Sequence, residues 1–224
     1  MFPIRDVNPS DRFPVVTVAI MLACSAAFLL ELAMGDGLER FVHAYGLVPR
    51  VITYGLETGT LGIDAVVAPF FSSMFLHGGW LHLIGNMWFL WIFGDNIEDT
   101  LGHFRYALFY LLCGLAAGLT HYYLSPLSPV PTIGASGAIA GVLGAYLIRF
   151  PGAKVVTLVP LGFFLQFMEL PAWLMLGLWF LVQAIGGFLT LGAAGGGVAW
   201  WAHVGGFLAG ITLFTILRPR RVMV

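Results

Sequence analysis

The chain has 224 residues and a formal net charge of −1, and 59% of its residues are hydrophobic while only 9% are charged. Soluble domains carry roughly 25% charged residues, so this chain has too few charges to cover a soluble globule. The composition excludes a cytosolic enzyme and a disordered protein, and ten basic against eleven acidic residues leave no basic surface for nucleic acid. It predicts a multi-pass integral membrane protein.

Six apolar runs meet or approach the length of about 20 residues that a helix needs to cross a bilayer. They lie at 15–34, 80–96, 106–124, 136–149, 171–190 and 198–217. The segment 35–76 is too apolar for a solvated loop, so we expect short amphipathic helices at the membrane interface. The sequence therefore predicts an all-α fold, in which residues 1–224 form a single membrane domain with six transmembrane helices and this interfacial loop domain between the first two.

The connection at 150–170 contains a further apolar run, 155–169, which Pro160 and Gly162 interrupt. Basic residues concentrate on the inner side of membrane proteins, and a six-span topology with both termini inside places eight of the ten there. These eight are Arg5, Arg12, Arg105, Arg149, Lys154, Arg218, Arg220 and Arg221, whereas Arg40 and Arg50 lie outside. A seventh crossing would reverse part of this bias. We therefore expect 155–169 to be an interfacial or re-entrant segment on the inner side.

Ser136 opens the fourth predicted span, after the irregular sequence Pro131-Thr-Ile-Gly-Ala. Polar residues within spans cost free energy unless they have a partner or a purpose. A serine at a helix start is commonly an N-cap, which is the structural alternative. The Gly-x-Ser-x-Gly pattern of soluble hydrolases is not met, because position 138 is alanine.

His203 lies near the outer end of the last predicted span. It could simply donate to a neighbouring carbonyl. However, Gly206 and Gly210 on this span, and Gly137 and Gly141 on the fourth, form faces of small residues that allow two helices to approach closely. With six spans these two helices run in the same direction, so Ser136 and His203 are expected at one depth and within hydrogen-bond reach.

His82 and Asn86 open the second predicted span and, being four residues apart, share one helical face. They could be interhelical hydrogen-bonding residues, or a pair of donors aimed at a developing oxyanion. His77 precedes His82 by five residues and could line a water entrance.

These three groups together resemble the rhomboid intramembrane serine proteases. The motifs are Gly-x-Ser-Gly at 134–137, Ala-His-x-x-Gly-x-x-x-Gly at 202–210 and His-x-x-x-Asn at 82–86, in the family's order, with Gly94-Asp-Asn-Ile-Glu98 also similar. The resemblance implies that Ser136 is the nucleophile and His203 the general base of a dyad without an acidic third member. It also implies that His82, Asn86 and the backbone N–H of Ser136 bind the oxyanion, that no cofactor or metal is needed, and that transmembrane segments of other proteins are the substrates.

One departure concerns the residue that holds the histidine. Some rhomboids carry an aromatic side chain four positions after the serine, where this chain has Ala140, so other packing must orient His203. Outside the site, we expect Glu98 to pair with Arg105, and Glu31 to reach the interface or be capped by the segment 35–76.

Two other functions compete with proteolysis. A non-catalytic rhomboid-like protein that binds membrane clients is expected to lack the serine or the histidine, and this chain has both. A transporter or proton channel would spread titratable groups across the membrane, whereas His82 and His203 are predicted on one side. The expected partners are transmembrane proteins and the lipid bilayer, with no nucleic acid, and the compact plan favours a prokaryotic plasma membrane.

Overall fold

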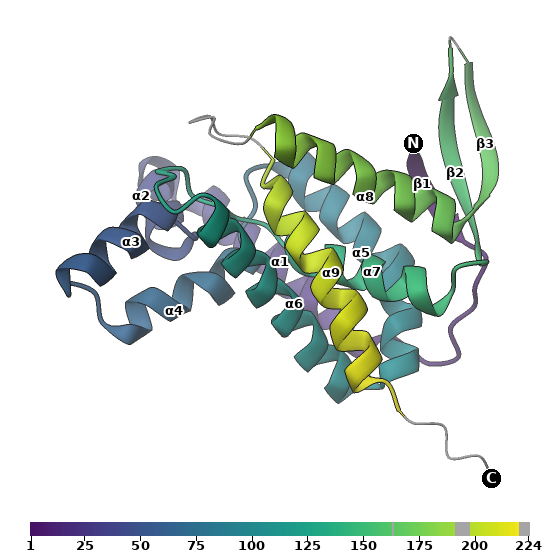
Figure 1. The fold of residues 1–224 in the computed structure, drawn as a ribbon, viewed down its shortest axis with the longest axis horizontal. Coiled ribbons are helices and arrows are strands. Elements are labelled where there is room, and N and C mark those ends of the chain that lie inside the picture. Colours follow the sequence, from purple (N-terminus) through teal and green to yellow (C-terminus); the bar gives the residue numbers. More distant parts are fainter. Residues whose placement is uncertain (163, 191–197, 220–224) are drawn as a thin grey trace.

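The computed structural model describes residues 1–162, 164–190 and 198–219, and most of them are helical. Two short 3-10 turns and three strands complete the described fold (Figure 1). The helices are α1 (Val15–Ala33), α2 (Leu38–Tyr45), α3 (Pro49–Thr58), α4 (Ile63–Ser72), α5 (Trp80–Leu101), α6 (His103–Leu124), α7 (Ser136–Arg149), α8 (Ala172–Leu189) and α9 (Trp200–Leu217). The 3-10 turns are Gly35–Gly37 and Ser73–Phe75, and the strands are β1 (Phe2–Asp6), β2 (Lys154–Leu161) and β3 (Phe164–Pro171).

Each predicted span corresponds to a helix, although the helices differ in length and polarity. Among the described helices, α1, α6, α8 and α9 are long and apolar enough to cross a membrane. Helix α7 has only 14 residues, and the 22-residue α5 carries acidic residues at its end. The chain is thus a mostly helical, multi-pass membrane protein, and the count of six spans stays a prediction.

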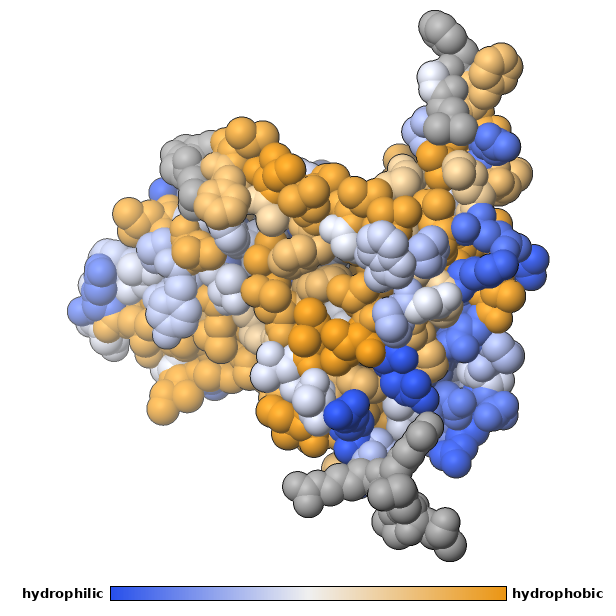
Figure 2. Space-filling view, turned by 45° about the vertical axis from the view of Figure 1, so that its right-hand side comes forward, coloured by the Kyte–Doolittle hydropathy of each residue, from blue (hydrophilic) through white to orange (hydrophobic). Residues whose placement is uncertain are grey.

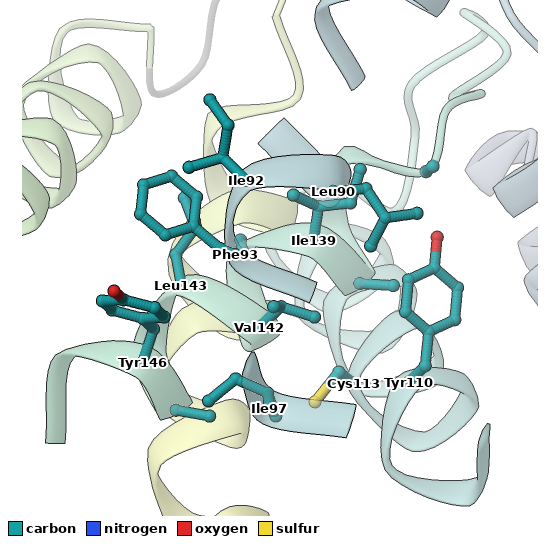
Figure 3. Packing of buried hydrophobic residues seen from close by; sticks show 14 of the residues in the cluster. Leu90, Ile92, Phe93, Ile97, Tyr110, Cys113, Ile139, Val142, Leu143 and Tyr146 are labelled. Carbon is teal, nitrogen blue, oxygen red and sulfur yellow. The ribbon is translucent and has the colours of Figure 1, made fainter. Parts of the chain in front are cut away.

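Helix α7 forms the centre of the bundle. Ten of its fourteen residues are buried, and it packs against α5, α6, α8 and α9. Figure 3 shows Ile139, Val142 and Leu143 of α7 facing Phe93 of α5 and Cys113 of α6. A helix that is apolar on all sides belongs in the interior, because no polar stripe faces a solvent. Ser136, the first residue of α7, is therefore held by a buried and tightly packed helix.

The glycines of α7 and α9 allow the two backbones to touch. A Cβ atom on Gly206 would overlap the carbonyl oxygen of Gly137, and one on Gly210 would overlap that of Gly141. Only glycine lets helices approach this closely. The predicted contact between the fourth and sixth spans is confirmed.

The prediction of an all-α protein is wrong at the end of the molecule that carries the N-terminal strand. Strands β2 and β3 form an antiparallel hairpin, in which Lys154 is opposite Pro171, and β1 pairs antiparallel with β2 to complete a three-stranded sheet in the order β1-β2-β3. Val155, Val156 and Thr157 favour a strand because their branched side chains fit a pleated surface. Gly162 has a φ of +61°, which suits the tight turn. The run 155–169, predicted as an interfacial or re-entrant segment, is this hairpin.

Strand β1 is anchored to two helices. The indole N–H of Trp88 on α5 donates to the carbonyl of Pro3 at 2.7 Å, and the Phe2 ring stacks on Trp88. The hydroxyl of Tyr146 on α7 donates to Asp6 at 2.6 Å. Burial of Asp6 raises the pKa of its carboxyl to about 6, even though the bond from Tyr146 acts in the opposite direction.

The segment 35–76 folds into the short helices α2, α3 and α4, which lie together at one end of the molecule (Figure 1). Leu47, Ile52 and Phe70 form a small apolar cluster, which packs against Leu119 and Tyr122 of α6. Leu47 also makes an isolated antiparallel bridge with Thr132, its N–H donating at 3.0 Å and its carbonyl accepting at 2.8 Å. This segment therefore supports the loop that precedes Ser136.

Two buried acids, Glu98 and Glu31, accept hydrogen bonds from backbone N–H groups. Glu98 accepts the N–H groups of Val16 and Thr17 at 2.8 Å each and lies 2.6 Å from His103. Within the described residues it forms no hydrogen bond or ion pair with Arg105, so the expected pairing of Glu98 with Arg105 is wrong. The carboxylate satisfies amides at the start of α1 that have no partner within the helix. Glu31 is 2% exposed, so it does not reach the interface, and it accepts the N–H of His77, the residue directly after the segment 35–76, at 3.1 and 3.2 Å.

Candidate active site

Ser136 is the first residue of α7, and an extended loop leads to it. In this loop the Gly134 N–H donates to the carbonyl of Ser73 at 2.8 Å, and Gly134 has a φ of +127°, which other residues rarely adopt. The Ser136 N–H, at the helix start, has no acceptor four residues earlier within the helix. The hydroxyl therefore sits at the end of a buried helix, beside a free backbone donor.

His203 of α9 meets this serine. Its Nε2 lies 2.7 Å from Ser136 Oγ, which is a normal hydrogen-bond distance for the pair. The backbone contact between Gly137 and Gly206 lies one residue beyond the serine and three beyond the histidine, so it fixes the spacing between the two side chains. The structure thus brings together the two residues that the sequence analysis expected to meet.

The other ring nitrogen of His203 has a partner that the sequence analysis missed. Gln183 of α8 is 7% exposed, and its Oε1 lies 2.7 Å from Nδ1. The Trp179 ring, one turn earlier on α8, lies 5.9 Å from the imidazole between centroids. Gln183 and Trp179 thus contact the His203 ring, which the small side chain of Ala140 cannot hold in place. A lone amide in an otherwise apolar span was the signal that could have identified Gln183.

The amide oxygen of Gln183 determines the protonation of the neutral imidazole. An amide oxygen only accepts, so the Nδ1–H of His203 donates to it, and the lone pair of Nε2 then faces the serine hydroxyl. In this tautomer Ser136 Oγ–H donates to Nε2. The arrangement is that of a nucleophile, a base and a residue that orients the base.

His82 and Asn86 approach the serine loop from α5. A Cβ atom on Gly134 would lie 2.7 Å from His82 Nε2 and 3.7 Å from Asn86 Nδ2, so both nitrogens face the loop at that glycine. The Gly78 N–H donates to His82 Nδ1 at 3.3 Å, which leaves the proton of a neutral ring on Nε2. Asn86 is 8% exposed, and its Nδ2 is buried with no hydrogen-bond partner among the residues that the structure describes. Two N–H donors are therefore directed at the loop.

All four predicted site residues line one cavity of about 680 Å³. Its wall is otherwise largely apolar, with Phe89 from α5, Ile139 and Leu143 from α7, and Trp179 from α8. The histidine predicted to line a water entrance does not reach it, because His77 is 2% exposed and is held by Glu31. A mostly apolar cavity with few convergent polar groups is typical of a site that binds an apolar chain. In the described part of the chain, no three His, Cys, Asp or Glu side chains lie close enough together to hold a metal ion.

Comparison with known proteins agrees with the motifs. The rhomboid domain family matches residues 65–220, well over half of the chain. The chain belongs to the rhomboid family. Rhomboid protein 1, mitochondrial, of Saccharomyces cerevisiae is 31% identical over 147 residues, which cover 62% of this chain and 39% of that protein. Rhomboid-like protein 11, chloroplastic, of Arabidopsis thaliana is 34% identical over 98 residues, covering 42% and 35%.

The name of a third relative describes it as a protease. Rhomboid protease GluP of Bacillus subtilis is 33% identical over 97 residues, covering 43% of this chain and 18% of that protein. The matched segments span less than half the length of these relatives. Their names include mitochondrial and chloroplastic proteins as well as one from a bacterium, so the expectation of a prokaryotic plasma membrane is not supported.

Proposed function

We propose that this rhomboid is an intramembrane serine endopeptidase that cleaves transmembrane segments of other membrane proteins. The observation that carries the proposal is the 2.7 Å contact between Ser136 Oγ and His203 Nε2, with His203 Nδ1 in turn bonded to Gln183. A serine is a weak nucleophile until a neighbouring base takes its proton. The contact supplies that base in the correct tautomer.

The first step forms a covalent bond between enzyme and substrate. Ser136 Oγ attacks the scissile carbonyl carbon, and its proton passes to His203 Nε2 as the new C–O bond forms. The imidazolium then gives this proton to the leaving amine as the C–N bond breaks, which leaves an acyl-enzyme. A water molecule, deprotonated by the same nitrogen, attacks the acyl carbon and releases the carboxylic acid and the serine hydroxyl.

The negative oxygen of the tetrahedral intermediate requires fixed donors. We assign this role to His82 Nε2–H, Asn86 Nδ2 and the backbone N–H of Ser136. Support comes from the direction of both side chains toward Gly134 and from the unpartnered, buried amide of Asn86. A buried donor without a partner costs free energy in the resting protein. That cost is recovered when an oxyanion arrives, and a well-placed donor contributes about 3 kcal/mol to catalysis.

The membrane topology that we propose has six spans with both termini on the inner side, so the serine and histidine lie near the outer face. The hydrolysis requires water, and polar groups are tolerated at membrane depth where they line a water-filled cavity. The mostly apolar wall formed by Phe89, Ile139 and Leu143 suits an apolar substrate segment. Substrates are therefore expected among transmembrane segments that can unwind near this face.

The alternative is a non-catalytic rhomboid that binds membrane clients in the same cavity. Such a protein has no need for a serine hydroxyl bonded to a histidine whose second nitrogen is also bonded. The two consecutive hydrogen bonds that link Ser136 to His203 and His203 to Gln183 therefore favour the protease.

A fluorophosphonate probe tests the nucleophile, because it labels only an activated serine. The purified 224-residue chain and its Ser136→Ala variant are treated with the probe and incubated with a single-span substrate protein. Ser128 lines the same cavity, so Ser128→Ala is the matched control. We expect labelling and cleavage in the native chain and in Ser128→Ala, and neither in Ser136→Ala. Labelling that persists in Ser136→Ala would falsify the assignment, and binding of the substrate without cleavage by the native chain would favour the client-binding alternative.

A further inference from the structure

The hairpin of β2 and β3 exposes apolar side chains on both of its faces. Phe164 is 79% exposed, Leu165 68% and Phe167 66%, and every residue from Phe164 to Glu169 is exposed. Successive side chains of a strand point to opposite faces, so Leu165 and Phe167 occupy one face and Phe164 the other. A sheet that meets water on one side shows alternating apolar and polar residues. Strand β3 lacks this alternation, which argues against water on either face.

Charge is absent from the hairpin and concentrated at its base. No Asp, Glu, Lys or Arg occurs between Val155 and Met168. Lys154 and Glu169 form an ion pair of 2.9 Å where the hairpin joins the bundle, and the exposed Arg5 lies on the neighbouring strand. This distribution resembles that of a segment whose end enters an apolar phase while its base stays in water.

The hairpin projects beyond the helices. Strand β1 pairs with β2 only from Val155 to Leu158, and the residues that follow reach past the bundle (Figure 1). In Figure 2 the projecting part rises above the surface, with hydrophilic residues gathered below it on the same side of the molecule. Within the described residues, the side chains of Phe164, Leu165 and Phe167 are therefore mostly uncovered by protein.

The lipid-facing surface of α8 continues directly into this hairpin. Strand β3 ends at Pro171 and α8 begins at Ala172, and the Ala172 N–H donates to the carbonyl of Ala153 at 2.8 Å. Leu181, Val182 and Phe188 on α8 are all more than half exposed, as expected for a helix in contact with lipid. Trp173, in the first turn of α8, is 56% exposed, so exposed apolar side chains lie on both sides of the junction between the strand and the helix.

We propose that the hairpin is a membrane anchor that lies in the lipid interface on the side of the N-terminal strand, with its apolar side chains among the acyl chains. Lipid of the bilayer, and no protein partner, covers the exposed apolar surface of the hairpin. The backbone determines the depth, because β3 is an edge strand of the described sheet and its outer N–H and C=O groups have no partner strand there. Such groups are not tolerated in the hydrocarbon core, whereas water reaches them at the interface. The hairpin therefore lies along the membrane surface and does not cross the membrane.

Site-directed spin labelling tests this placement without reference to enzymatic activity. Cysteines at Leu165 and Met168, on opposite faces of β3, carry the label in the 224-residue chain in phosphatidylcholine–phosphatidylglycerol vesicles. The native Cys24 and Cys113 are fully buried, so the unsubstituted chain measures the background. Leu181→Cys is the lipid reference, and Glu57→Cys, at an exposed charged position, is the water reference.

The measured quantity is the accessibility of each label to oxygen, which dissolves in lipid, relative to a water-soluble nickel chelate. We expect this ratio at positions 165 and 168 to exceed that at Glu57 several-fold, and to lie nearer to that at Leu181. A ratio at both positions equal to that at Glu57 places the hairpin in water and overturns the proposal. Protection of one position from both reagents shows that a protein surface covers that face, and this also overturns it. Failure of Ser136 labelling in the earlier experiment leaves this result unaffected.

Discussion

Gln183 and His203 are bonded across adjoining helices, with 2.7 Å between the amide oxygen and Nδ1 of the ring. The amide carries no charge, so it orients the imidazole without stabilising the imidazolium as a carboxylate would. Loss of the acidic member of a soluble triad reduces the rate by about 10⁴-fold. A protease that relies on a neutral amide is therefore expected to turn over slowly.

Replacement of Gln183 by leucine tests this orienting role. We expect kcat to fall by roughly one to two orders of magnitude while KM changes little, because only the tautomer and the ring orientation are disturbed. Gln183→Glu, which retains an oxygen acceptor, serves as the matched control and should keep most of the activity. An unchanged kcat in Gln183→Leu would show that Trp179 alone holds the ring. Cleavage of a single-span substrate at several concentrations provides both constants.

The close contact between α7 and α9 predicts a large cost for one methyl group. In Gly206→Ala the added Cβ overlaps the Gly137 carbonyl, so the helices must separate, and overpacking of this kind costs about 1–3 kcal/mol. Gly177→Ala on α8 is the control, because a Cβ there meets no atom within 4 Å. Thermal unfolding in detergent should show a lower midpoint for Gly206→Ala alone. Equal midpoints for the two variants would contradict the contact.

Removal of Glu31 should loosen the loop that supports His82. Glu31→Ala leaves the buried His77 N–H without an acceptor, which costs about 1–3 kcal/mol. The neighbouring Gly78 N–H bonds to His82, so cleavage should weaken together with stability. Glu31→Gln keeps an acceptor, so its stability and its cleavage activity should lie between those of the native chain and Glu31→Ala. Hydrogen exchange of residues 76–79 measures the loosening, and exchange that is equally slow in Glu31→Ala would disprove this role.

The attachment of β1 should depend on pH through Asp6. Its carboxyl has a folded-state pKa of about 6, above its ordinary value, because burial disfavours the charged form. The folded strand therefore holds this proton more tightly than the free strand. Its stabilising contribution is complete below about pH 4 and is lost as the pH rises through about 6. Hydrogen exchange of residues 2–6 should accelerate over this interval. Asp6→Asn should remove the dependence, and the same pH profile in that variant would point to another group.

The sequence predicted the helices and the pairing of the site residues well, because both depend on local patterns. Apolar runs located the helices to within a few residues, and the glycine faces predicted the contact that brings Ser136 and His203 together. What it missed depends on long-range partners. Nothing local indicates that Gln183 faces a histidine twenty residues later, or that the N-terminal strand pairs with a hairpin about 150 residues away.

The errors have a related cause. An apolar run of 15 residues can be a strand pair or a helix, and hydropathy alone does not separate them. The β-branched residues Val155, Val156 and Thr157 were the local signal that favoured a strand over a helix. For Glu98, proximity in sequence favoured Arg105, whereas the structure satisfies the carboxylate with two backbone amides of α1.

The glycine contact between α7 and α9 has a consequence for how such proteins can diverge. Main-chain atoms of the two helices meet directly, so the backbone sets how far apart the helices that carry the hydroxyl and the imidazole lie. Surfaces that face lipid are then free to change with the thickness and composition of the host bilayer. The same reacting pair can occur in proteins of different organelles and organisms as long as the positions of Gly137, Gly141, Gly206 and Gly210 carry no side chain.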